Sequence, residues 1–264
     1  ATFAAAAPLL AQTTRPQGGA AASPPPAAPA QSPPAADGPD FEVPKEIKKL
    51  DIINLRDIEA EAQKIIPGGS FGYIASAAGD EWTKHENEAA YKRLTIETRA
   101  LTGYKDADLA TTLLGAKISM PIIVTAMGGH GNAHVTAEAG TAKGVAAVGT
   151  LFTTPSQSSI PMEEIMKASP GPKWFQMYMP QDQGIARDLV HRAKAAGFLA
   201  IVLTIDAIGG SNRETNIRNG FSSWLPSGNF PNGRVPNKQD LSWDDVALLQ
   251  KESGLPVIIK GVMS

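Results

Sequence analysis

The chain has 264 residues, of which 42% are hydrophobic, so it can bury the core of one large or two modest domains. Its 24 basic and 26 acidic residues nearly balance and no run of 18 apolar residues occurs, so we expect neither a nucleic-acid partner nor a membrane span. Cysteine is absent, which excludes disulfides, thiolate metal sites and a cysteine nucleophile, and we expect no metal site.

Residues 1–40 differ in composition from the rest. The opening "ATFAAAAPLLAQ" is similar to an apolar export-signal core that runs into a small-residue cleavage region. The Pro/Ala-rich segment 13–39 cannot bury enough apolar area to offset its chain entropy, so it is predicted to be a disordered tether. We therefore expect a periplasmic or secreted protein. The alternative is a cytoplasmic protein with a low-complexity tail.

The globular part is expected to span residues 41–264, and three helices are predicted at its start. Asn54 is the candidate N-cap of "NLRDIEAEAQKII", which should end at "PGG". Ser70 is the candidate cap of "SFGYIASAAG", and "DEWTKHENEAAYKRL" is the third predicted helix.

From Pro121 onward, predicted strands alternate with predicted helices. The strands should begin near residues 122, 150, 173, 199 and 256, and the helices should cover 134–148, 162–167, 185–196 and a segment capped by Ser242 with Asp245. Residues 207–241 are expected to be irregular. Strands that are apolar on both faces indicate a parallel sheet, which either an open doubly wound sheet or a (β/α)8 barrel would provide.

Polar residues at or near the carboxyl ends of the predicted strands favour the barrel: Thr125, Thr153, Gln176, Tyr178, Thr204, Asp206 and Lys260. A barrel gathers such groups from many strands, whereas an open sheet concentrates them at one switch point. The expected fold class is therefore α/β, a TIM barrel of which the N-terminal helices and about five strands are present. A barrel needs eight strands, an apolar last strand would be an unpaired edge, and the sequence begins with alanine in place of methionine, so we expect a chain truncated at both ends.

Four segments of the sequence resemble a known family: "FGYIASAAGDEWTKHENEAAYKR", "WFQMYMPQDQ", "IVLTIDAIGGSNRETNIRNGF" and "LPVIIKGV". In order and spacing they resemble the FMN-dependent L-2-hydroxy acid oxidases, the group of glycolate oxidase and lactate oxidase, over about residues 41–264. The motifs "GDEWTK", "HGNAH" and "WFQMYM" resemble the lactate oxidase branch.

The resemblance implies an FMN-holding (β/α)8 barrel and a homotetramer. It also implies oxidation of a small L-2-hydroxy acid, with lactate as the candidate, to the 2-oxo acid and reduction of O2 to hydrogen peroxide. Two alternatives stay open. One is a dehydrogenase or monooxygenase of the same family that passes electrons elsewhere, and the other is a non-catalytic truncated polypeptide.

The resemblance also assigns residues to FMN. Gln176 and Thr204 match positions at the polar edge of the flavin ring, where an amide supplies both a donor and an acceptor. Lys260 matches a lysine whose ammonium stabilises the negative charge of the reduced flavin. The alternative is a strand-end lysine that only reaches solvent. Thr153, at the end of the expected second strand, is also assigned to FMN.

The turn "TAMGGHG" matches the place where the family packs its backbone against the flavin's central ring, which assigns Ala126, Met127 and Gly128 to FMN. The family usually has proline at Ala126 and alanine at Gly128, so the choice of electron acceptor is open. Its flavin-contacting serine aligns with Pro155, which offers neither a hydroxyl nor an N–H. Either a neighbouring hydroxyl compensates (Thr153, Thr154 or Ser156) or the contact is lost.

On the substrate side, Arg213 matches the family's first carboxylate-binding arginine, since a guanidinium can bind a carboxylate through two hydrogen bonds. Tyr73 and Tyr178 match two tyrosines whose hydroxyls face the substrate. A surface arginine and buried tyrosines with other partners are the alternatives. Asp206 is expected to be structural or orienting. The irregular stretch resembles the family's lid, with Trp224, Pro226 and Phe230.

No residue of this chain matches the family's base histidine, its second arginine or its flavin-phosphate site. The four histidines, His85, His130, His134 and His191, fall at other places in the pattern, and we expect structural roles for them.

Overall fold

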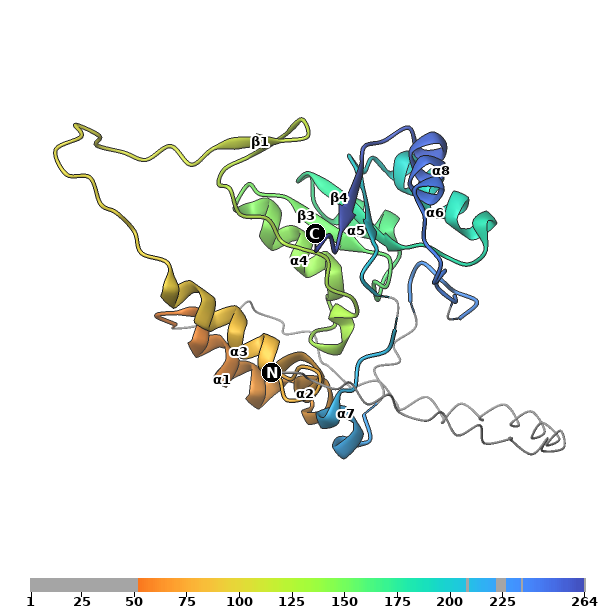
Figure 1. Cartoon of the computed structure of the whole chain (residues 1–264), viewed down its shortest axis with the longest axis horizontal. Helices are drawn as coiled ribbons and strands as arrows, with labels where there is room; N and C mark the ends of the chain where they lie inside the picture. Colours follow the sequence, from red (N-terminus) through yellow and green to blue (C-terminus); the bar gives the residue numbers. More distant parts are fainter. Residues whose placement is uncertain (1–51, 208, 222–226, 234, 264) are drawn as a thin grey trace, which may run out of the picture. The chain divides into compact units, whose positions relative to one another are not determined.

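The structure is a computed structural model that describes residues 52–207, 209–221, 227–233 and 235–263 (Figure 1). The expected export segment and tether lie outside these residues, as do Trp224 and Pro226 of the expected lid. Within the described ranges, none of the helices has the length and apolar character needed to cross a membrane.

Three helices precede the sheet: α1 (Leu55–Ile65), α2 (Gly68–Ala75) and α3 (Trp82–Ala89), which a 3-10 turn, η1 (Ala90–Arg93), extends. Asn54 caps α1 as predicted. Its side chain accepts a hydrogen bond from the backbone of Arg56, and the side chain of Asp57 accepts one from the backbone of Asn54.

The predicted cap at Ser70 is wrong, because α2 begins two residues earlier and Ser70 is buried within it. Pro67 is the residue before the first turn of α2, and its φ of −52° lies in the narrow range to which the proline ring restricts it. Proline is well suited to this position, because it has no N–H to donate within a helix. Gly69 faces Phe221 so closely that a Cβ there would lie 2.5 Å from the ring. The two glycines expected to end the first helix therefore begin the second, and a contact distant in sequence explains one of them.

An antiparallel hairpin that was not predicted follows, formed by β1 (Thr111–Leu113) and β2 (Ala116–Ile118). Leu114 and Gly115 between the strands have φ values of +44° and +83°, and positive φ at both positions matches the right-handed twist of a tight hairpin. Ala116 and Ile118 pack in one cluster with residues near the amino ends of the sheet strands: Leu151, Trp174 and Ala200.

The main sheet consists of four parallel strands in chain order: β3 (Phe152–Pro155), β4 (Lys173–Tyr178), β5 (Ile201–Thr204) and β6 (Val257–Lys260). An order without reversal is that of a barrel, since a doubly wound sheet reverses its order at the switch point. The strand predicted near residue 122 is wrong. Val124 forms only a single parallel bridge to Phe152, and the N–H of Ile122 donates to Met120 instead of a neighbouring strand.

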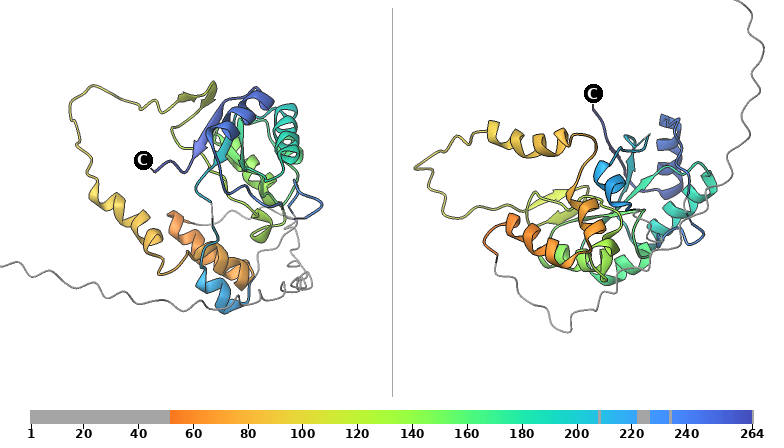
Figure 2. Two further views of the ribbon diagram at one scale, coloured as in Figure 1. Left: turned by 45° about the vertical axis from the view of Figure 1, so that its right-hand side comes forward. Right: turned by 90° about the horizontal axis from the view of Figure 1, so that it is seen from below.

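Four helices alternate with these strands: α4 (Ala137–Ala147), α5 (Met162–Ala168), α6 (Gln183–Ala196) and α8 (Trp243–Ser253), and a short 3-10 turn, η2 (His130–Asn132), precedes α4. Ser242 and Asp245 form the predicted capping box of α8. Apolar residues of α5, α6 and α8 pack against β4 and β5 in one buried cluster, and Figure 2 shows α6 and α8 together beside the strands.

The stretch 207–241 is less irregular than expected, because it contains the helix α7 (Glu214–Asn219). Phe230, which was assigned to the lid, is only 9% exposed and belongs to the cluster beneath α6 and α8. The part of the stretch 207–241 around Phe230 is therefore held in the core.

Candidate active site

The strand register places four of the predicted site residues on one face of the sheet. Tyr178 pairs with Thr204, and Thr204 pairs with Lys260, so these three form a row across β4, β5 and β6. Gln176 precedes Tyr178 by two residues and therefore points to the same side. It is the side opposite the helices, and the row lies at the carboxyl ends of the strands.

Gln176 and Thr204 are joined by a hydrogen bond. Both side chains are almost fully buried, and Nε2 of Gln176 donates to Oγ1 of Thr204 at 2.9 Å. This bond fixes the orientation of the amide and leaves its carbonyl oxygen as an acceptor for a donor at the strand ends.

Lys260 lies beside Asp206, with Nζ at 3.3 Å from Oδ1, and both side chains are 45% exposed. Gly261 follows with φ +104°, and a Cβ at this position would lie 2.5 Å from Cγ of Asp206. Only a glycine therefore allows the carboxylate to lie against the end of β6. The arrangement gives Asp206 the geometry of a group that orients Lys260.

Tyr73, Tyr178 and Arg213 come from α2, β4 and the residue before α7. The guanidinium of Arg213 lies over the ring of Tyr73, 4.6 Å from its centroid, and donates to the backbone oxygen of Tyr73 at 3.2 Å. No carboxylate of the described residues forms an ion pair with Arg213. Burial, followed by the charges of Asp206 and Tyr73, raises the pKa of Tyr178, so its phenol stays protonated and can donate.

The turn after Val124 presents unpaired backbone donors. In the described part of the chain, the N–H groups of Ala126, Met127 and Gly128 donate no hydrogen bond, and Met127 is 55% exposed. The next three N–H groups are all bonded, by Gln157, Glu138 and Ser159. Successive unpaired N–H groups suit an acceptor-rich ligand, and the polar edge of a flavin is one. The turn therefore fits FMN.

The second strand fits FMN less well. Pro155 pairs with Gln176 in the register, so it stands at the position from which the family's serine would face the flavin. Thr153 points to the same side but lies two residues deeper. Thr154 points to the opposite side, where its buried Oγ1 has no partner in the described structure. Of the two strand hydroxyls that could compensate for Pro155, only Thr153 therefore shares its face.

None of the four histidines lies at the strand ends. His85 is on α3, His191 on α6 is 3.2 Å from Glu252, and Nδ1 of His134 contacts the hydroxyl of Thr136.

His130 lies in the turn, where Nδ1 contacts the hydroxyl of Thr141 at 2.9 Å. Burial lowers the pKa of His130, and the charge of Glu138 opposes this shift only in part. A residue that acts as the base is therefore not found among these side chains.

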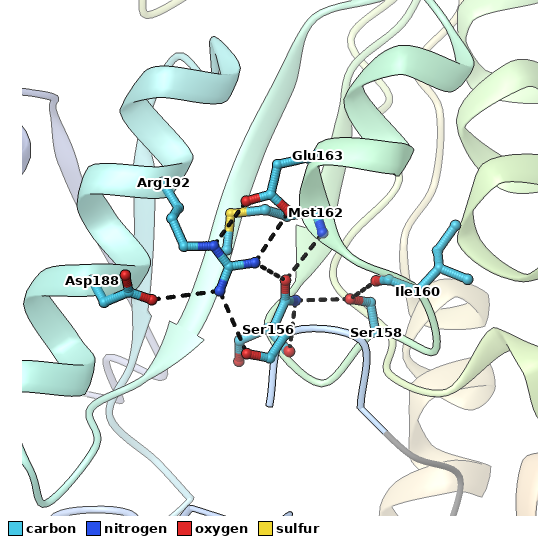
Figure 3. A network of polar contacts seen from close by, with 8 residues as sticks. Ser156, Ser158, Ile160, Met162, Glu163, Asp188 and Arg192 are labelled. Carbon is cyan, nitrogen blue, oxygen red and sulfur yellow. Dashed lines mark hydrogen bonds and ion pairs between the residues drawn. The ribbon is translucent and has the colours of Figure 1, made fainter. Parts of the chain in front are cut away.

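Sequence reasoning missed the buried polar residues that fix the loop after β3. The amide of Asn229, 3% exposed, donates to the backbone oxygen of Ser156 at 3.0 Å and to Oγ of Ser158 at 2.9 Å, and it accepts from the N–H of Met162 at 3.0 Å. Arg192 approaches this amide while it binds Glu163 at 2.8 and 3.1 Å (Figure 3). The only sequence signal was an asparagine between glycine and phenylalanine in "SGNF".

Comparison with known proteins agrees with this geometry. The chain is 40% identical to an L-lactate oxidase of Streptococcus iniae over 225 residues, which cover 80% of this chain and 56% of the relative. It is 36% identical to a glycolate oxidase of Spinacia oleracea over 234 residues, which cover 81% of this chain and 63% of the relative. The chain thus spans less than two thirds of the length of these relatives.

Solved structures give the same result. The crystal structure of a lactate oxidase of Pediococcus acidilactici matches with a TM-score of 0.79 and 36% identity, covering 82% of this chain and 62% of the other. A mandelate oxidase structure matches with a TM-score of 0.75 and 29% identity. The fold class predicted from the strand ends, an α/β barrel present in part, is confirmed. A family model described as FMN-dependent dehydrogenase matches residues 62–264, and the chain belongs to this family.

Proposed function

We propose that the full-length protein oxidises a small L-2-hydroxy acid, with L-lactate as the candidate, to the 2-oxo acid and transfers the electrons to O2. The observation that carries this proposal is the row of Tyr178, Thr204 and Lys260 at the strand ends, with Gln176 on the same face. A hydrogen-bond acceptor, a donor and a cation lie on one face of the sheet there. FMN bound at this face supplies the two-electron acceptor that the oxidation needs.

The residues that hold FMN in this proposal are those of the turn and of the strand ends. The unpaired N–H groups of Ala126, Met127 and Gly128 offer donors, and Thr153 offers a hydroxyl from β3. The Gln176 amide, whose orientation is fixed by Thr204, forms hydrogen bonds with the polar edge of the ring. Lys260 supplies a positive charge, and its contact with Asp206 keeps the ammonium at the strand end.

Arg213, Tyr73 and Tyr178 bind the substrate in this proposal. Arg213 faces no protein carboxylate among the described residues, so its charge is available for the carboxylate of a 2-hydroxy acid. The stack on Tyr73 holds the guanidinium in one plane. Tyr178 remains a phenol and donates a hydrogen bond to the substrate. No residue of this chain is assigned as the base, and we place the base in the part of the relatives' length that this chain does not span.

A second candidate is a dehydrogenase or monooxygenase of the same family, favoured by one observation. Gly128 stands where the family resemblance implies alanine, and a Cβ there would lie 3.0 Å from the backbone oxygen of Gln157, so the glycine lets the turn lie closer to the loop after β3. A changed position of the turn can change which acceptor reaches the reduced cofactor. Assembly as a homotetramer is a further proposal, and light scattering of the purified protein tests it.

The test begins with the full-length protein as isolated. It should contain FMN, release hydrogen peroxide from L-lactate or glycolate in air, and consume O2 in equal amounts. Substrate-dependent reduction of an artificial carrier without peroxide would favour the dehydrogenase. A protein that binds no FMN, or that does not reduce FMN with either acid, would exclude both candidates.

A further inference from the structure

Glu138 is a buried carboxylate whose bonding partners all lie near the proposed flavin turn. It is the second residue of α4 and has no exposed surface. Its oxygens accept hydrogen bonds from the N–H of His130 at 3.0 Å and from the N–H of Ser159 at 3.0 Å, and the hydroxyl of Ser159 approaches at 3.4 Å. Burying a carboxylate costs free energy, and these hydrogen bonds offset part of that cost.

These bonds tie the turn to the loop after β3. The N–H of Gly129 donates to the backbone oxygen of Gln157 at 3.0 Å, that of His130 donates to Glu138, and that of Gly131 donates to the hydroxyl of Ser159 at 2.9 Å. Three consecutive donors are thus bonded to one group of acceptors. The three donors before them, from residues 126–128, remain unpaired among the described residues.

The backbone beside Glu138 is strained. Ala137 has φ +46°, in the left-handed region that a residue with a Cβ rarely adopts. Such a conformation persists where surrounding contacts stabilise it, and here these include the hydrogen bond from the N–H of Ala137 to the backbone oxygen of His134 at 3.0 Å and the bonds of the adjacent Glu138. The first turn of α4 also favours a negative charge, because its unpaired N–H groups carry partial positive charge.

From this arrangement we infer that Glu138 is a positioning residue for the flavin turn. Its carboxylate holds residues 129–131 against residues 157–159, and this fixes the position at which the N–H groups of residues 126–128 meet FMN. The inference rests on the proposed FMN site. It concerns the geometry of bound FMN and not a step of the reaction.

The experiment measures FMN binding to the full-length protein. Apoprotein is titrated with FMN and followed by flavin fluorescence, and the absorption spectrum of the bound flavin is recorded for the wild type and three variants. Glu138→Gln keeps the shape and one oxygen that can accept from His130 and Ser159, but it removes the negative charge and puts an NH2 group in place of the second oxygen, near the N–H of Ser159, to which it cannot bond. Ser159→Ala removes the acceptor of Gly131. Glu252→Gln is the matched control, since it changes another carboxylate, which binds Arg187 and His191 on α6 away from the turn and from the loop after β3.

Glu138→Gln should raise the Kd of FMN about ten-fold, equivalent to about 1.4 kcal/mol, and shift the absorption maxima of the bound flavin. Ser159→Ala should change both in the same direction by less, and it carries the test if Glu138→Gln does not fold. Glu252→Gln should lower the melting temperature and leave the Kd and the spectrum unchanged.

Two results would overturn the inference. One is an unchanged Kd and spectrum in both turn variants while the wild type binds FMN. The other is an equal change in the Glu252→Gln control, which would show a general effect of stability. If the wild-type apoprotein does not bind FMN at all, the proposed function fails first and the inference fails with it.

Discussion

Replacing Asn229 by alanine should destabilise the protein strongly, although the residue is small and polar. The side chain is 3% exposed and makes three hydrogen bonds of 3.0 Å or less, to Ser156, Ser158 and Met162. Asn229→Ala removes all three hydrogen bonds at once. The neighbouring Gly228 already packs tightly against the loop after β3, since a Cβ on it would lie 2.1 Å from the backbone of Ile160. The backbone therefore has little freedom to move into the space that the Asn229 side chain leaves.

The magnitude follows from the groups left without partners. The N–H of Met162 loses its acceptor, and a buried unpaired backbone group costs about 1–3 kcal/mol. The carbonyl of Ser156 keeps a weak contact with the hydroxyl of Ser227 at 3.4 Å, so its loss is smaller. The hydroxyl of Ser158 still donates to Ile160. The expected loss in the free energy of unfolding is therefore about 2–4 kcal/mol.

The assay is urea unfolding of the full-length protein followed by tryptophan fluorescence, with the loss taken from the shift of the midpoint multiplied by the slope. Asn87→Ala is the control, because Asn87 is exposed on α3 and alanine favours a helix. The control should change stability by no more than about 0.5 kcal/mol. A loss below about 1 kcal/mol for Asn229→Ala would refute the reasoning, since water would then have replaced the buried bonds.

Three further predictions concern the site. Lys260→Met should slow flavin reduction on the order of 100-fold in stopped-flow absorbance while changing substrate affinity little, and unchanged reduction kinetics would remove the lysine from the site. Arg213→Lys should lower kcat/KM for 2-hydroxy acids by a factor on the order of 10 to 1,000 with unchanged FMN content, and full activity would contradict the assignment. Because burial lowers the pKa of His130, the unfolded chain binds a proton there more readily than the folded one, and stability should fall as the pH drops below about 6.5. This pH dependence should weaken in His130→Gln, as urea midpoints at pH 7.5 and 5.5 would show.

Local chemistry made part of the fold predictable. Asn54 with Asp57 and Ser242 with Asp245 form capping boxes that can be identified from four neighbouring residues. The strands β3 to β6 follow from apolar runs, and their polar ends indicated the common face. The role of each polar residue came from the resemblance and not from the pattern.

The parts that were missed depend on contacts distant in sequence. Gly69 starts a helix because Phe221 leaves no room for a side chain, and no local pattern contains that information. The bonds of Asn229 and Glu138 join segments that lie up to 73 residues apart. Burial alone distinguishes them from the many polar residues at the surface, and burial follows only from the assembled sheet.

The contact between Gly128 and Gln157 has a consequence for how the site can change. A Cβ on Gly128 would lie 3.0 Å from the backbone oxygen of Gln157, which is tighter than ordinary packing allows. A change to alanine, the residue usual in the family, would therefore push the two loops apart by a few tenths of an ångström. Residues in contact seldom contribute independently. The effect of a substitution at residue 128 should thus depend on which residues stand at 157–159, and the effect of a substitution at 157–159 should depend on residue 128.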